Sequence, residues 1–195
     1  MNLFNKLGKI ILASSSPRRL DLLKSLGLKN IQVIKPSIDE KSFLDKNALK
    51  KSVRNIAMQK AIYVKKMHKD LKDSTIIAGD TIVFRAGKIL HKAESKEGVK
   101  SHLNYLSSRK HNVYGGICII SKEGKIFCKV VVTEIFFEKL EEVDLSDKLL
   151  EEGVGKAGGY AIQGMASKFV RKIKGSYTNV VGLSIPEVYK IFKII

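Results

Sequence analysis

The segment 74–84 (STIIAGDTIVF) places the tightest constraint on how this chain can fold. It is β-branched or apolar almost throughout, which predicts a central strand buried on both faces of a sheet. Asp80 interrupts the run, and an ionised carboxylate inside a buried strand is costly unless a metal or a cation pairs with it. The alternative is a turn aspartate after Gly79, between two short strands. We favour a functional carboxylate, because no loop composition surrounds Asp80.

A second segment, 12–19 (LASSSPRR), predicts an anion site. It follows an apolar run and precedes leucines at helical spacing, which indicates a strand, a turn of small residues and an amphipathic helix. Ser16 stands at the N-cap position and Pro17 at the first helical position. Arg18 and Arg19, beside the N–H groups of the first turn, would then hold an anion. The alternative is an ordinary capped helix with two solvated arginines.

The strongest helix signal lies at 47–68, where apolar side chains recur at helical spacing and define one face. Lys60 lies within this face. A lysine there either snorkels past its neighbours to water or points into a cleft at a negative charge, and snorkelling is the commoner case. The apolar face consists of Leu49, Val53, Ile56, Ala57, Ala61 and Val64.

The remaining segments predict an α/β fold with a mixed sheet, in one continuous unit that could form two lobes around a cleft. The glycine-rich stretch 153–164 lacks the ending and the preceding strand of a nucleotide P-loop, so that interpretation is rejected. A glycine-rich turn that brings backbone close to a ligand remains open. We expect strands at 31–34, 89–92 and 167–174, a hairpin of 114–120 and 125–137, helices at 93–106, at 144–152 and from 184 onward, and a polar turn at 175–182.

The charge balance favours anionic partners. The chain has 195 residues with 36 Lys+Arg against 19 Asp+Glu, a net charge of +17, and such a field attracts nucleic acid or small phosphates. However, the lysines are scattered, no aromatic-rich basic motif occurs, and there is no Trp. A generally basic surface is therefore favoured over a dedicated nucleic-acid interface.

The sequence contains few features that indicate a cellular compartment. Cys118 and Cys128 are the only cysteines, too few for a disulfide framework and not in a metal-binding spacing, so a reduced, cytoplasmic setting is expected. The first residues carry no long apolar run, and no segment reaches the ~18 apolar residues of a membrane span. We therefore expect neither a secretory signal nor a membrane partner.

Ordered sequence blocks identify a family resemblance. With the blocks 12–19, 38–40 (IDE), 79–83 (GDTIV), 156–164 (KAGGYAIQG) and 175–183 (GSYTNVVGL), the chain resembles the Maf-like nucleoside triphosphate pyrophosphatases over essentially its whole length. The resemblance implies a single domain over 1–195, an elongated α/β fold of two lobes around a cleft, similar in outline to inosine triphosphate pyrophosphatases. It also implies hydrolysis of a nucleoside triphosphate to the monophosphate and pyrophosphate.

The resemblance also implies residue roles. Asp80 falls on the family's proton acceptor, and Glu40 and Asp80 have oxygen ligands suited to a divalent cation, Mg²⁺ or Mn²⁺. We expect Asp80, with the metal, to activate water for in-line attack at the α-phosphorus. The positions matching the family's active site are Ser14, Arg18, Glu40, Lys60, Asp80 and Lys92.

Substrate choice is implied by three further positions. Arg19, Thr81 and Gln163 follow the pattern of the branch that prefers dTTP and UTP over the branch that prefers 7-methyl-GTP. The chain departs from the family around Lys92, where His91 and Ala93 replace Gly and Pro. It also departs at Gly155, where Asp is usual, and at Ser108, where Gly is usual. These departures weaken the substrate assignment more than the reaction class.

Two other functions stay open at this point. One is a basic nucleic-acid-binding or septum-regulating protein without catalysis, in line with the cell-division role from which the family takes its name. The other is a phosphatase that releases orthophosphate. The oligomeric state is also open, with a homodimer as one option.

Overall fold

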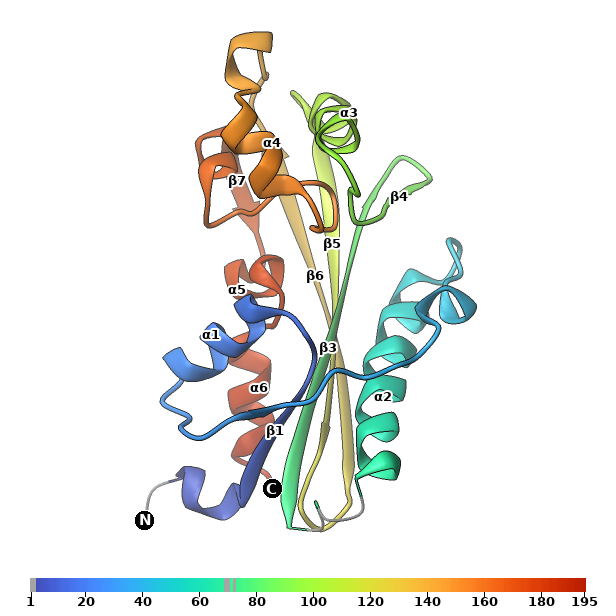
Figure 1. The fold of residues 1–195 in the computed structure, drawn as a ribbon, viewed down its shortest axis with the longest axis vertical. Coiled ribbons are helices and arrows are strands. Elements are labelled where there is room, and N and C mark those ends of the chain that lie inside the picture. Colours follow the sequence, from blue (N-terminus) through green and yellow to red (C-terminus); the bar gives the residue numbers. More distant parts are fainter. Residues whose placement is uncertain (1–2, 69–70, 72) are drawn as a thin grey trace. The chain divides into compact units, whose positions relative to one another are not determined.

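The computed structural model describes residues 3–68, 71 and 73–195. Within them, the strands form one seven-stranded sheet in the order β2-β1-β3-β5-β6-β7, with β4 beside β3 (Figure 1). β1 pairs in parallel with β2 and β3, whereas the β3–β4 and β6–β7 pairs are antiparallel. The predicted mixed sheet flanked by helices is therefore confirmed. The strands are β1 (Lys9–Ala13), β2 (Gln32–Val33), β3 (Ser74–Arg85), β4 (Lys88–Leu90), β5 (Lys110–Ile120), β6 (Ile126–Phe137) and β7 (Val170–Lys174).

The chain divides into two compact units. The first unit comprises Met1–Asp80, Gly115–Val131 and Gly182–Ile195, and the second comprises Thr81–Tyr114 and Val132–Val181. The helices of the first unit are α1 (Pro17–Ser25), α2 (Leu49–Met67) and α6 (Ile185–Phe192), with 3₁₀ turns η1 (Leu3–Leu7) and η2 (Glu40–Phe43). Those of the second are α3 (Lys96–Leu106), α4 (Asp147–Gly153) and α5 (Tyr177–Val181), with η3 (Glu142–Asp144) and η4 (Met165–Phe169).

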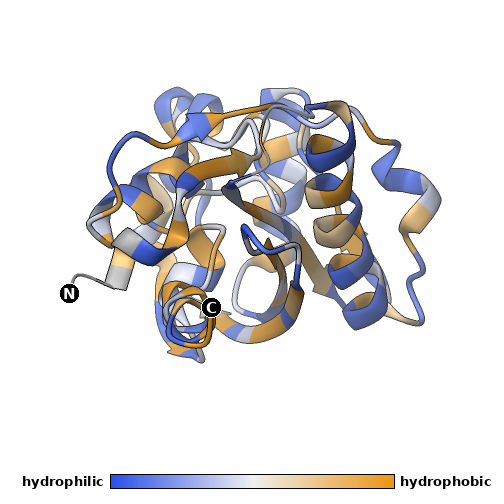
Figure 2. Cartoon of the chain, turned by 90° about the horizontal axis from the view of Figure 1, so that it is seen from below, coloured by the Kyte–Doolittle hydropathy of each residue, from blue (hydrophilic) through white to orange (hydrophobic). Residues whose placement is uncertain are grey.

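Two hydrophobic cores cover the two faces of the sheet in the first unit. Successive side chains of a strand point to opposite faces, so Leu12 and Ile77 pack with α1 and α6, whereas Ile11 and Ile76 pack with α2. Both views agree that α2 lies on one side of β3 and the pair α1 and α6 on the other (Figures 1 and 2). This two-sided burial explains why 74–84 is apolar without alternation.

Helix α2 confirms the prediction for 47–68, and every residue of its predicted apolar face is buried. Its backbone lies directly on β5, because a Cβ on Gly116 would come within 2.1 Å of the Val53 carbonyl oxygen. A larger residue at 116 would therefore push the helix off the sheet. Among the helices of the described residues, none has both the length and the apolar composition of a membrane span.

The second unit has an aromatic core. Phe137 packs edge-to-face against both His111 and Tyr160, and it also contacts Phe169. His111 Nε2 lies 2.7 Å from the Tyr160 hydroxyl, so these two atoms satisfy one another, whereas His111 Nδ1 is buried without a partner among the described residues. The helices α3 and α4 pack against each other in the same unit.

Two segments near the C-terminus differ from the prediction. The polar turn expected at 175–182 is wrong, because Tyr177–Val181 forms α5. The buried Asn179 ties this helix to the sheet, because its side-chain amide donates to the Val113 carbonyl and to Thr133 Oγ1. The strand expected at 167–174 begins only at Val170, because the preceding residues belong to η4.

Two helices begin later than predicted. α3 begins at Lys96 and α4 at Asp147, rather than at 93 and 144. In each case a serine caps the helix: Ser95 Oγ accepts from the Gly98 N–H, and Ser146 Oγ accepts from the Leu149 N–H. The N-cap preference of serine sets these boundaries.

Candidate active site

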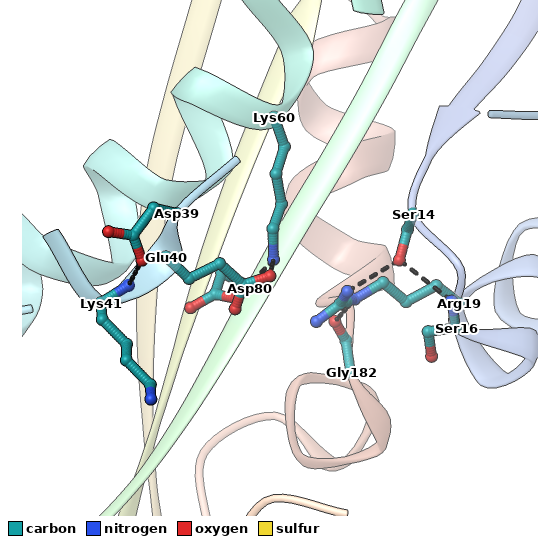
Figure 3. Close-up of polar contacts among 9 residues, drawn as sticks. All are labelled: Ser14, Ser16, Arg19, Asp39, Glu40, Lys41, Lys60, Asp80 and Gly182. Carbon is teal, nitrogen blue, oxygen red and sulfur yellow. Dashed lines mark hydrogen bonds and ion pairs between the residues drawn. The ribbon is translucent and has the colours of Figure 1, made fainter. Parts of the chain in front are cut away.

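The segment after β1 is anchored by Arg19. Its Nε donates to the Gly182 carbonyl at 2.8 Å and its Nη1 donates to Ser14 Oγ at 2.9 Å (Figure 3). Ser16 occupies the N-cap position of α1 and Pro17 its first turn, as predicted, although the Ser16 side chain makes no capping hydrogen bond. The strand–turn–helix prediction is therefore confirmed.

The sheet register explains why this segment lies beside Asp80. Ala13 and Ala78 are partners in the parallel β1–β3 ladder, so the residues that follow them, Ser14 and Gly79, extend in the same direction. A Cβ on Gly79 would lie 3.1 Å from Arg19 Nε. Glycine at 79 is therefore what lets the guanidinium lie against β3, one residue before Asp80.

The two arginines of the first motif differ in environment. Arg19 is 9% exposed, whereas Arg18 is half-buried. Burial lowers the pKa of Arg19 below its usual value, and the negative charges of Asp80 and Glu40 partly oppose that shift. An arginine stays protonated even so. The alternative of two solvated arginines is therefore wrong for Arg19.

The hydrogen bonds of Ser14 leave its hydroxyl hydrogen for a ligand. Ser14 Oγ accepts from Arg19 Nη1 and from the Ser16 N–H at 3.2 Å. A hydroxyl has two acceptor sites and one hydrogen to donate. Within the part of the chain that the structure describes, that hydrogen has no acceptor. The buried Ser14 hydroxyl is thus oriented as a donor.

Lys60 joins two carboxylates. Its Nζ lies 2.8 Å from Asp80 Oδ1 and 2.8 Å from Glu40 Oε1 (Figure 3). The Lys60 and Asp80 side chains are 7% and 9% exposed, whereas the Glu40 side chain is 41% exposed. The lysine therefore does not snorkel to water but points at negative charge. Asp80 lies inside one continuous strand, so the alternative of a turn aspartate is also wrong.

Three separate elements bring these charges together. Lys60 comes from the buried face of α2, Asp80 from β3, and Glu40 from the start of η2. The turn η2 begins at Glu40 because the Asp39 side chain accepts from the Lys41 N–H at 3.1 Å. Removing two charges from water is costly unless each is paired, and here each buried charge has an opposite partner.

The two carboxylates fit a divalent cation. Mg²⁺ keeps several waters and binds through one or two carboxylates together with substrate phosphates, rather than in an all-protein cage. Glu40 and Asp80 supply two such oxygen ligands, both within reach of the same amine. In the described residues no group of three or more His, Cys, Asp or Glu side chains converges on a metal position. The donor set therefore suits an ion shared with a phosphate ligand.

The other predicted site residues, Thr81, Lys92 and Gln163, belong to the second unit. Thr81 is half-buried, and Lys92 and Gln163 are exposed. Lys92 forms an isolated β-bridge with Ala157, which ties it to the glycine-rich stretch. The structure thus brings together Ser14 with Arg19, and Glu40 with Lys60 and Asp80, within the first unit.

Three of the four departures from the family pattern lie along this backbone bridge. The Gly155 N–H donates to the Ala93 carbonyl at 2.7 Å, and the Gly158 N–H donates to the carbonyl oxygens of Leu90 and His91. Gly155 has a φ of +74°, which a non-glycine residue rarely adopts. Changes at positions 91, 93 and 155 therefore occur at segments that contact one another through their backbones.

Two residues with structural roles, Gly182 and His111, were not predicted from the sequence. The carbonyl of Gly182 holds Arg19, and its φ of +144° needs glycine. The only sequence signal was its place in the block 175–183. His111 gave no signal, yet burial lowers its pKa to about 3, so it is neutral beside Tyr160.

Comparisons with known proteins agree with the resemblance. The family model described as Maf-like protein matches residues 9–195. A dTTP/UTP pyrophosphatase of Paramagnetospirillum magneticum is 39% identical over 184 residues, which cover 91% of this chain and 92% of that protein. A dTTP/UTP pyrophosphatase of Clostridium perfringens (strain SM101) is 38% identical, with coverage of 93% and 94%.

A solved structure supports the fold. The Staphylococcus aureus Ham1 protein matches with a TM-score of 0.52 at 14% sequence identity, covering 95% of this chain and 98% of that one. A likeness at this identity concerns the fold alone, and it agrees with the mixed sheet flanked by helices.

Proposed function

This chain belongs to the Maf-like protein family, and on that premise we propose that it is a nucleoside triphosphate pyrophosphatase. It hydrolyses a nucleoside triphosphate to the monophosphate and pyrophosphate. The observation that carries the proposal is the buried Lys60 amine held between Glu40 and Asp80. A fold that buries the Lys60 and Asp80 charges beside the middle of β3 accepts a cost in stability that packing alone does not require.

We propose dTTP and UTP as the preferred substrates. The relatives of this chain at 38–39% identity carry that activity in their names. Arg19, Thr81 and Gln163 match the pattern of that branch. Both contacts of Arg19 involve its guanidinium, which is therefore not free to reach toward the nucleobase. Arg19 acts instead by holding Ser14 and the Gly182 backbone in place.

The first unit supplies groups for the phosphates. A triphosphate carries about four negative charges at neutral pH and needs cations and donors that match them. Arg18 is half-buried at the first turn of α1, next to the N-terminal end of the helix dipole. Ser14 donates its hydroxyl hydrogen to a phosphate oxygen. Lys92 remains a predicted phosphate ligand from the second unit.

Asp80 acts as the general base. Lys60 Nζ donates to Asp80 Oδ1, and within the described residues no other hydrogen bond reaches this carboxylate. Its second oxygen, Oδ2, can therefore take a proton from water. Glu40 and Asp80 would hold Mg²⁺ or Mn²⁺, which when bound polarises the phosphate oxygens and offsets their charge. Lys60 keeps both carboxylates oriented.

A product assay tests the proposal. The protein is incubated with a panel of nucleoside triphosphates and Mg²⁺, and the released ions are identified. We expect pyrophosphate and the monophosphate, with dTTP and UTP turned over fastest. Release of orthophosphate and the diphosphate indicates the competing phosphatase. No turnover together with tight binding to DNA or RNA supports the polyanion-binding alternative suggested by the net charge of +17.

Three further expectations stay predictions. A homodimer is tested by size-exclusion chromatography with light scattering. A cytoplasmic location and a link to cell division are tested by imaging a tagged chain in its host and by following septum formation when the protein is overproduced. The activity assay decides none of them.

A further inference from the structure

The two cysteines of the chain face one another on adjacent strands. β5 and β6 are neighbours joined by the turn 121–125, in which the Ser121 N–H donates to the Lys125 carbonyl at 2.9 Å. Counting three residues outward from each end of this turn pair places Cys118 opposite Cys128. Their Sγ atoms lie 3.1 Å apart, and both thiols are free. Only a small movement separates this arrangement from a covalent bond.

The two thiols differ in accessibility. Cys118 is completely buried in the core that packs against Ala57 and Ala61 of α2. Cys128 is half-buried at the edge of the same core. A dissolved reagent therefore reaches the Cys128 thiol first, and the buried Cys118 thiol is in contact with it.

The electrostatic environment also makes Cys128 the more reactive of the two thiols. The hydrogen bond with Cys118 and the positive charge of Arg54 on α2 lower the pKa of Cys128 to about 7. The same hydrogen bond, together with burial, raises the pKa of Cys118. The thiolate is the reactive form of cysteine, so near neutral pH Cys128 is a nucleophile and Cys118 is a protonated resolving thiol.

We propose that Cys118 and Cys128 form an oxidation-sensitive dithiol, which a hydroperoxide converts to an intramolecular disulfide. The Cys128 thiolate attacks the terminal oxygen of the hydroperoxide, the O–O bond breaks, and the alkoxide leaves and takes up a proton as the alcohol. Cys128 is then a sulfenic acid. Cys118 attacks its sulfur, the S–S bond forms, and the hydroxyl leaves with the Cys118 proton as water. Two thiols are oxidised and one hydroperoxide is reduced.

The experiment uses the full-length, reduced protein and hydrogen peroxide. After exposure, the protein is unfolded in an alkylating reagent and its intact mass is measured. We expect a monomer that has lost two hydrogen atoms and takes up no alkyl group, and that takes up two after treatment with dithiothreitol. Two alkylated thiols after exposure, or a disulfide found only between two chains, would overturn the proposal.

Matched variants assign the order of events. In Cys118→Ala, the sulfenic acid at Cys128 has no resolving thiol, so it is trapped by dimedone as one adduct. In Cys128→Ala, the buried Cys118 stays a thiol at the same peroxide dose. Oxidation of Cys118 in that variant would contradict Cys128 as the attacked residue. The wild-type mass measurement needs no variant, so the proposal remains testable if either variant folds poorly.

Discussion

The two units differ in the polar groups that they bury. Among the described residues, the buried charged side chains are Arg19, Lys60 and Asp80, and all three lie in the first unit. The buried polar side chains of the second unit are neutral: His111, Thr133 and Asn179. Buried charge costs more than a buried hydrogen-bonded neutral group. Burying these charges therefore costs the first unit stability, whereas the neutral polar groups of the second unit hold its own core together.

The same difference between the units determines which elements could be predicted from the sequence. The runs 47–68 and 74–84 predicted α2 and β3, because long apolar patterns determine which face is buried. The helical pattern also predicted that Lys60 either reaches water or points at a negative charge. It could not decide between these alternatives, because Glu40 and Asp80 approach the Lys60 amine only through tertiary packing.

The second unit was harder to predict for a physical reason. The helix α5 is short, and its buried Asn179 donates through its side-chain amide to the Val113 carbonyl and to Thr133 Oγ1, which belong to distant strands. Polar residues such as Ser176 and Asn179 are typical of turns when they are considered locally. Neutral hydrogen bonds between segments far apart in sequence leave no local pattern, so neither α5 nor the role of His111 was predictable.

Removing the central cation should have the largest effect on stability. Lys60→Met leaves the buried Asp80 carboxylate without its partner, so the free energy of unfolding should fall by about 3–5 kcal/mol. Urea denaturation followed by circular dichroism measures it. Lys96→Met is the matched control, because Lys96 pairs with Glu151 at the surface and its loss should change little. Equal effects of the two substitutions would contradict the account of the buried charges.

Removing the proposed base should affect turnover more than folding. Asp80→Asn keeps the shape of the side chain but cannot accept a proton, so kcat should fall on the order of 10² or more. Steady-state release of pyrophosphate measures the rate. Asp147→Asn, at an exposed carboxylate that pairs with Lys96, should keep wild-type activity. A variant Asp80→Asn with normal kcat would remove Asp80 from the mechanism.

The second unit should respond to acid through His111. Its imidazole titrates near pH 6.5 when unfolded, whereas burial lowers its folded pKa to about 3. Between these values the unfolded chain binds the extra proton. The stability contributed by the neutral ring is therefore complete above about pH 6.5 and is lost as the pH falls toward 3, by up to ~1.4 kcal/mol per pH unit.

A substitution isolates this contribution from that of the carboxylates. His111→Gln keeps a polar group near Tyr160 but does not titrate, so its unfolding free energy should fall less steeply between pH 6 and pH 4 than that of the wild type. Denaturant titrations at a series of pH values give both slopes. Parallel curves would show that His111 is not the neutral group that the geometry indicates.

The smallest expected effect concerns the fixed guanidinium. Arg19→Lys keeps the charge but loses the fork that reaches both Gly182 and Ser14, so kcat/KM should fall about tenfold, the equivalent of one charged hydrogen bond. The matched control is Arg171→Lys, at an exposed site 3.9 Å from Glu138. An unchanged kcat/KM in Arg19→Lys would show that positive charge alone suffices at this position.

The most direct test of the central claim follows the oxygen that water contributes. In the proposed mechanism, Asp80 activates water for attack at the α-phosphorus. Hydrolysis of dTTP in water labelled with heavy oxygen should therefore place the label in the monophosphate and leave pyrophosphate unlabelled, as read by phosphorus NMR or mass spectrometry of the products. Label in pyrophosphate, or in orthophosphate, would mean that water attacks a different phosphorus, and the proposed reaction would be contradicted.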